Sequence, residues 1–214
     1  MVEFFRNTVE YQNFGFNALT ISSLATVIFT LFQGWGFWKQ NQSIWKERSG
    51  KSVSVNFFSY CCFYFFTFII YGAYKHGLAM MFNGCLGFVV LPILIGLGKY
   101  KGFTRSNVML ILVFGMMIPA MIFTSEKDSL FTMLLFGILF SAITQPYEIW
   151  KTKNAGAVDP RLSITFIVNG VFWFVYALSI GNRPLAIFQP IAVVFFSVTL
   201  ALWKKYQPAK GGAR

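Results

Sequence analysis

The stretch that decides the fold runs from Asp159 to Gln189 and reads DPRLSITFIVNGVFWFVYALSIGNRPLAIFQ. It contains two apolar runs, separated by the turn sequence at 181–184. Within the first run, Asn169 and Trp173 are four residues apart and therefore share one face of a helix. Amides and an indole N–H are costly in hydrocarbon unless they face protein or a water-filled cavity. The stretch is therefore interpreted as one wall of a polar cavity inside a membrane protein.

The composition of the chain indicates the same class. Of its 214 residues, 56% are hydrophobic and 12% are charged, whereas soluble domains carry about 25% charged residues. Cys61, Cys62 and Cys85 lie in apolar runs without metal-binding spacing, and we interpret all three as small packing residues. One histidine cannot build a metal site or a catalytic triad, so we expect no cofactor and no enzymatic activity.

Seven apolar segments approach the roughly 20 residues that a helix needs to cross a bilayer. They are 17–38, 53–74, 77–98, 107–124, 128–150, 160–180 and 184–205. The sequence thus predicts an all-α membrane protein with seven transmembrane helices. Residues 1–16 are expected to form a short interfacial segment, and 206–214 a tail.

The basic residues indicate the orientation of these helices. Of the 18 Lys and Arg residues, all but four fall in the loops 39–52, 99–106 and 151–161 or near the C-terminus. The four on the other side are Arg6, Lys75, Lys127 and Arg183. Because cytosolic loops are enriched in Lys and Arg, we predict a cytosolic C-terminus and an extracytosolic N-terminus in a plasma or inner membrane. The net charge of +11 is accordingly interpreted as a topology signal and not as a nucleic-acid surface.

The chain also repeats itself at an offset of about 105 residues, at which Ile44-Trp45-Lys46 matches Ile149-Trp150-Lys151. The same offset pairs Gln40 with Gln145, Phe68 with Trp173 and Tyr71 with Tyr176, and one further residue pairs Asn83 with Gln189. The predicted repeats are 17–98 and 128–205, two parallel three-helix bundles joined by a linker helix at 107–124. Transporters built from repeats bind their substrate at the repeat interface near mid-membrane.

This arrangement resembles the SWEET sugar transporters of the PQ-loop superfamily. The resemblance is carried by Asn169-Gly-x-x-Trp173-Phe-Val-Tyr176 with Pro184 and Gln189, and by the basic turn at 151–153. It implies transport of a small solute, most simply a mono- or disaccharide, down its gradient by alternating access. The chain departs from the family where Gln189 replaces an asparagine, and where Lys39 and Thr144 replace the proline of the Pro-Gln pair.

The predicted substrate-binding residues are Asn83, Trp173, Gln189, Asn169 and Phe68. Amides offer donors and an acceptor without charge, which suits a polyol, and an indole face suits stacking on a sugar ring. Each residue also has a structural alternative, namely interhelical packing or a hydrogen bond worth roughly 0.6 kcal/mol. We also expect Trp173 to be unnecessary for core packing. The residues predicted to act in gating are Pro146, Pro160, Pro190, Gln40 and Gln145.

Coupling to an ion has little support in the sequence. No acidic residue lies mid-segment, and Glu148 is expected at the cytosolic end of its helix, paired with Lys151, which favours a uniporter over a proton symporter. Alternatives are a PQ-loop transporter of an amino acid or another small metabolite, or a seven-helix sorting receptor. The expected partners are the solute and lipid, while homo-oligomerisation stays open.

Overall fold

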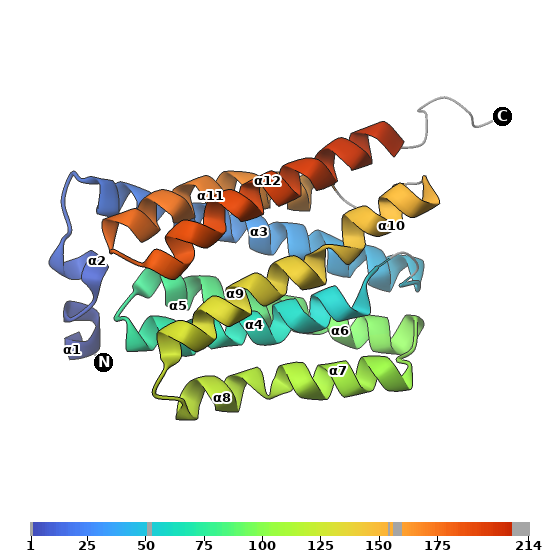
Figure 1. The fold of residues 1–214 in the computed structure, drawn as a ribbon, viewed down its shortest axis with the longest axis horizontal. Helices are drawn as coiled ribbons and strands as arrows, with labels where there is room; N and C mark the ends of the chain where they lie inside the picture. The colour runs from blue at the N-terminus through green and yellow to red at the C-terminus, as the bar shows by residue number, and fades with distance from the viewer. Residues whose placement is uncertain (1, 51–52, 154, 156–159, 207–214) are drawn as a thin grey trace.

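The computed structural model describes residues 2–50, 53–153, 155 and 160–206, and all regular secondary structure within them is helical (Figure 1). The helices are α1 Val2–Arg6, α2 Val9–Gln12, α3 Ala18–Glu47, α4 Val55–Tyr74, α5 Leu78–Gly84, α6 Leu86–Tyr100, α7 Arg105–Gly115, α8 Met117–Phe123, α9 Lys127–Ala142, α10 Thr144–Thr152, α11 Pro160–Ser179 and α12 Arg183–Tyr206. The predicted all-α membrane fold is confirmed.

The long helices form elongated segments that run side by side (Figure 1). Three pairs join nearly end to end, namely α5 with α6, α7 with α8, and α9 with α10. One end of the bundle, here called the amino end, holds α1, α2 and the connections at 75–77, 124–126 and 180–182. The other end, here called the basic end, holds the last turns of α3, α6, α10 and α12.

Five of these segments are long and apolar enough to cross a membrane, within the described part of the chain. They are α3, α4, α5 with α6, α7 with α8, and α12. A shorter apolar stretch covers 163–179 in α11. The apolar runs predicted at these places therefore all fold as helices.

The packing order of the helices is the same in both halves of the chain. In the first half α3 and α4 both pack on the α5–α6 segment, and in the second half α11 and α9–α10 both pack on α12. Between the halves, α3 meets α11 and α4 meets α9, while α7 and α8 lie against α4. This is the order expected of two related three-helix units around an approximate twofold axis, which remains our interpretation of the domain organisation.

Two of the helix breaks have prolines as their physical cause. The break at Met116 precedes Pro119 by three residues, and the break at Ile143 precedes Pro146 by three residues. A helix-interior proline lacks the N–H for its i−4 partner and its ring crowds that carbonyl. Pro146 thus accounts for the break between α9 and α10 near the basic end.

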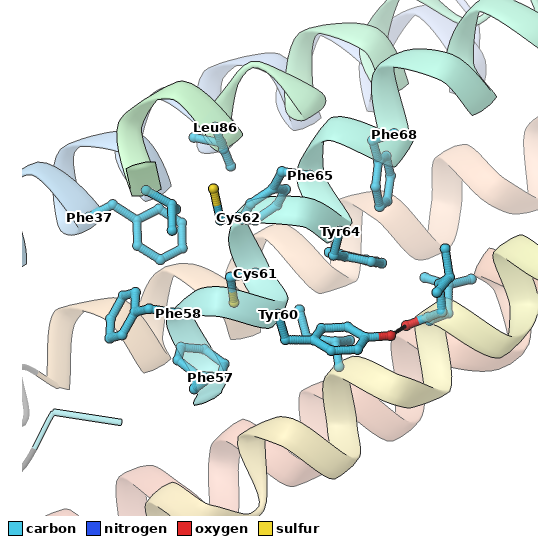
Figure 2. Packing of buried hydrophobic residues seen from close by; sticks show 14 of the residues in the cluster. Phe37, Phe57, Phe58, Tyr60, Cys61, Cys62, Tyr64, Phe65, Phe68 and Leu86 are labelled. Carbon is cyan, nitrogen blue, oxygen red and sulfur yellow. Dashed lines mark hydrogen bonds between the residues drawn. The ribbon is translucent and has the colours of Figure 1, made fainter. Parts of the chain in front are cut away.

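Helix α4 lies at the centre of the packed core (Figure 2). Phe65 contacts Phe37 of α3 edge-to-face, with ring centroids 5.8 Å apart. Tyr60 crosses to α9, where its hydroxyl donates to the Leu134 carbonyl at 2.7 Å beside Gly137. A side chain at Gly137 would collide with the Tyr60 hydroxyl, so glycine permits this contact between the two halves.

The cysteines differ in their environments. Cys61 and Cys62 are fully buried in this core, which confirms their interpretation as packing residues. Cys85 is exposed, so the same interpretation is wrong for it. It stands at the break between α5 and α6, and its thiol donates to the Met81 carbonyl.

Helix α3 turns its polar side inward. Thr26, Thr30 and Gln33 are buried, whereas Ile28 and Leu31 are exposed. In a bilayer the outer face of a helix contacts lipid, so polar groups are placed toward protein partners. This inverted pattern directs Thr30 and Gln33 toward the interior between the repeats.

Candidate solute-binding site

A single cavity between the two repeats brings together all five residues predicted to bind substrate. Phe68 of α4, Asn83 of α5, Asn169 and Trp173 of α11, and Gln189 of α12 line it. The remaining lining residues are Gln33, Tyr64, Phe65, Ile138, Leu139, Phe166, Gly170, Phe188, Ala192 and Phe196. The cavity has a volume of about 50 Å³, enough for a few water molecules.

Asn83 has one partner from the neighbouring helix. Its side-chain oxygen Oδ1 accepts a hydrogen bond from the Thr30 hydroxyl at 3.2 Å. This bond uses the acceptor of the amide and orients its Nδ2 group, for which no described residue serves as acceptor. Asn83 therefore presents N–H donors on the wall of the cavity.

Asn169 and Gln33 form a pair across the two repeats. The Asn169 Nδ2 group donates to the Gln33 Oε1 atom at 3.1 Å. The Asn169 Oδ1 atom is buried and has no hydrogen-bond partner. An unpaired buried acceptor is unfavourable by about 1–3 kcal/mol, so this atom would be stabilised by a donor from a solute.

Gln33 was not among the residues predicted from the sequence. Its signal was present, because a glutamine in an apolar helix, three residues after Thr30, continues a polar stripe. The internal repeat does not indicate Gln33, because the matched position in the second repeat holds the apolar residue Ile138. Both Gln33 and Ile138 line the cavity.

Gln189 faces the cavity without a partner in the described chain. It is 7% exposed, and it packs beside Gly170 of the neighbouring helix. A methyl group added at Gly170 would approach the Val193 side chain to 2.8 Å. Glycine thus lets α11 and α12 come close, and it holds the Gln189 amide at the cavity wall.

The two aromatic side chains that the internal repeat pairs, Phe68 and Trp173, are in contact. Phe68 and Trp173 meet edge-to-face with ring centroids 5.9 Å apart. Trp173 is only 4% exposed and also touches Tyr176, with ring centroids 5.4 Å apart. The expectation that Trp173 is unnecessary for packing is therefore wrong, because its ring fills the core between the repeats.

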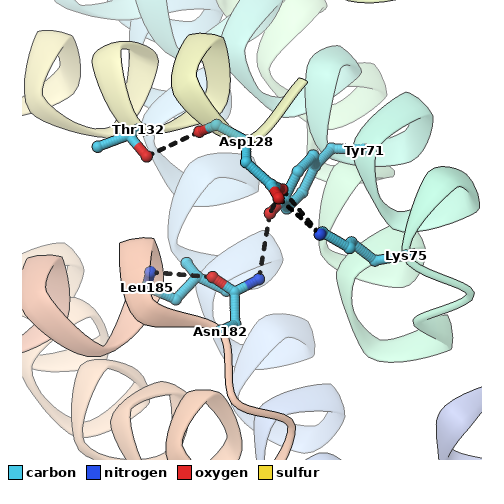
Figure 3. Close-up of polar contacts among 6 residues, drawn as sticks. All are labelled: Tyr71, Lys75, Asp128, Thr132, Asn182 and Leu185. Carbon is cyan, nitrogen blue, oxygen red and sulfur yellow. Dashed lines mark hydrogen bonds and ion pairs between the residues drawn. The ribbon is translucent and has the colours of Figure 1, made fainter. Parts of the chain in front are cut away.

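On the amino-end side of this aromatic pair, a polar cluster joins the repeats (Figure 3). The Tyr71 hydroxyl of α4 donates to the Asp128 carboxylate of α9 at 2.7 Å. Lys75 forms an ion pair with the same carboxylate at 2.8 Å. Asn182 donates to the Tyr71 hydroxyl at 3.3 Å, and its Oδ1 accepts from the Leu185 backbone N–H at the start of α12.

The described residues among those predicted to act in gating lie on four different helices, namely Gln40 on α3, Pro146 on α10, Pro160 on α11 and Pro190 on α12. Gln40 is buried in α3, Pro160 is the first residue of α11, and Pro190 is exposed within α12. The side chains of Gln145 and Glu148 lie outside the described part of the structure. Among the residues that are described, no three His, Cys, Asp or Glu side chains gather in a way that could hold a metal ion.

Comparison with known proteins agrees with this geometry. Residues 129–211 match the family model described as "Sugar efflux transporter for intercellular exchange". The structure is similar to that of a eukaryotic SWEET transporter solved at 3.7 Å resolution, with a TM-score of 0.66 and 14% identity over 88% of this chain and 96% of that chain. A comparison with curated protein sequences finds no match. The resemblance is thereby confirmed: the second half of the chain matches the sequence model of the sugar efflux family, and the chain has the fold of a SWEET transporter.

Proposed function

We propose that this protein transports a small neutral hydroxylated solute, most simply a mono- or disaccharide, by facilitated diffusion with alternating access. The cavity between the repeats is the observation that supports this best. Its wall combines the amides of Gln33, Asn83, Asn169 and Gln189 with aromatic faces. Amides supply both donors and acceptors, which matches the mixed requirement of sugar hydroxyls.

The charge of the lining favours a neutral solute over an amino acid. None of the described lining residues is charged. A zwitterion buried in such a site would keep two charges without counter-charges, at a cost of several kcal/mol each. A hydroxylated solute makes no such demand. The same lack of a carboxylate in the lining supports a uniport mechanism, since proton relays in transporters use buried acidic or histidine residues.

The dimensions of the cavity support alternating access. A sugar ring stacked between two aromatic faces needs about 7 Å between the ring planes, at contact distances of about 3.5 Å on each side. Phe68 and Trp173 already touch, and the cavity holds only a few waters. Binding would therefore require the repeats to separate, and we infer that this structure is a contracted conformation.

Side-chain hydrogen bonds hold the repeats together at the amino end. At the amino end, the hydrogen bonds of Tyr71 with Asp128 and Asn182 join α4, α9 and the start of α12. From the distribution of Lys and Arg, this end would face the extracytosolic side. Access from that side would then require these bonds to break.

Uptake into proteoliposomes tests the proposal and its nearest rival. Purified protein would be reconstituted and given labelled glucose, sucrose and a panel of amino acids, with and without an inward proton gradient. Equilibration of a sugar, insensitive to the gradient, is the expected result. Uptake of amino acids alone, or accumulation driven by protons, would favour the rival transporter of the PQ-loop superfamily.

A further inference from the structure

The short helix α2 carries a carboxylate that contacts both repeats. The Glu10 Oε1 atom accepts from the Tyr176 hydroxyl of α11 at 2.7 Å and from the Ala79 backbone N–H at 2.9 Å. Its Oε2 atom accepts from the Leu78 backbone N–H at 3.0 Å. One side chain of the N-terminal segment thereby joins the start of α5, in the first repeat, to α11 in the second.

Glu10 accepts hydrogen bonds from three groups, namely two backbone N–H groups of α5 and the Tyr176 hydroxyl. The first N–H groups of a helix have no acceptor within the helix, and Glu10 supplies one for each of two in α5. The Tyr176 side chain is fully buried, and its hydroxyl has Glu10 as its acceptor. A buried hydroxyl without an acceptor is unfavourable, so Tyr176 depends on the N-terminal segment.

The backbone holds the N-terminal segment in the same place. The Val9 N–H donates to the His76 carbonyl at 2.9 Å, next to the start of α5. The Gly15 N–H donates to the Thr20 hydroxyl in the first turn of α3. The segment thus lies across the amino end as an ordered strap, where the sequence led us to expect only an interfacial segment.

The Glu10 contact is the counterpart of the Tyr71 contact. Tyr71 and Tyr176 are matched by the internal repeat, and each donates to a carboxylate at 2.7 Å. Asp128 lies in the first turn of the first helix of the second repeat, and Glu10 lies shortly before the first helix of the first repeat. Each tyrosine therefore bonds to the opposite repeat, or to the segment that leads into it.

We infer that Glu10 is a positioning residue that latches the amino end closed, so that the N-terminal segment is a moving part of the transporter. The inference rests on the proposed alternating access. When α11 moves away from α5 to open the amino end, Tyr176 and the two N–H groups of α5 cannot all remain on one carboxylate. Loss of Glu10 or of the Tyr176 hydroxyl then favours the open conformation.

Distance measurement between spin labels tests the latch without requiring transport. Labels would be placed at Tyr11 and Ser179, which are both exposed at the amino end, in a Cys85→Ser background. Each of Glu10→Ala and Tyr176→Phe removes a charge-assisted hydrogen bond, so the ratio of open to closed molecules is expected to rise roughly tenfold or more. Glu3→Ala, on the exposed side of the same segment, is the control and should match the wild type.

The double variant separates a latch from a general loss of structure. Because both single changes break the same tyrosine–carboxylate bond, Glu10→Ala with Tyr176→Phe should shift the distances little beyond Glu10→Ala alone. Glu10→Ala can also disturb α2 itself. Tyr176→Phe keeps the aromatic ring and removes only the hydroxyl, so it tests the hydrogen bond alone. Wild-type distances in a folded Tyr176→Phe variant would overturn the latch. Failure of all sugar uptake would overturn the proposed function but would leave this measurement valid.

Discussion

Replacing Gln189 by methionine is expected to weaken solute binding while leaving the protein at least as stable as the wild type. Methionine keeps the unbranched shape and approximate size of glutamine but has no amide. In the described structure the Gln189 amide lines the cavity and makes no hydrogen bond within the protein. Removal of this amide therefore leaves a solute hydroxyl without its hydrogen-bond partner, while no group of the protein loses one.

The two effects have opposite signs and can be estimated separately. A sugar hydroxyl left unpaired in the site costs about 1–3 kcal/mol, which corresponds to an increase in Kd of about 5-fold to 150-fold. Exchange of a buried, unpaired amide for an apolar group removes a desolvation cost of about 1 kcal/mol or more. In a chain of this size that change would raise Tm by about 2–4 °C.

Isothermal titration of the purified transporter with the sugar it carries measures the first effect, and thermal unfolding measures the second. Ser197→Ala on the exposed side of the same helix removes a hydroxyl that bonds only to the Val193 carbonyl, and it should leave the affinity unchanged. Wild-type affinity in Gln189→Met would refute the assignment of Gln189 to the site. A large loss of stability would show that its amide has a structural partner instead.

Three further predictions follow from the fold. Gly84→Ala should lower Tm by several degrees, because the added Cβ would lie 2.7 Å from the Ile69 nitrogen and 2.9 Å from the Phe65 carbonyl oxygen. Gly115→Ala is the control and should leave Tm unchanged, because the nearest neighbour of its Cβ is 3.7 Å away. A reporter enzyme fused to the C-terminus should be active in the cytosol, and activity outside would reverse the assigned orientation. In an Ala192→Cys, Cys85→Ser background, which puts a thiol on the cavity wall, Tyr71→Phe should raise extracytosolic labelling by impermeant thiol reagents roughly tenfold, whereas unchanged labelling would show that the Asp128 contact does not close this end.

Much of the candidate binding site could be predicted from the sequence because membrane helices constrain polar residues strongly. An amide or indole N–H in an apolar run must face protein or water, and the internal repeat of the sequence relates Phe68 to Trp173 and Asn83 to Gln189. The structure places all of them around one cavity. Gln33 was missed because its counterpart in the repeat is apolar. The packing role of Trp173 was missed because a position in the sequence does not indicate the distance between the two repeats.

The sequence by itself determined the all-helical membrane class, the helical segments and the polar faces of the helices, since hydrophobic runs of bilayer length have few other stable states. Only the tertiary structure decided which polar groups pair with one another. Asn169 bonds to Gln33 from 136 residues away, and Tyr176 bonds to Glu10 from 166 residues away. Such bonds depend on which helices are neighbours and on their relative heights. A shift of about 1 Å is enough to lose a hydrogen bond. The periodicity of the sequence does not specify the relative positions of helices to that precision.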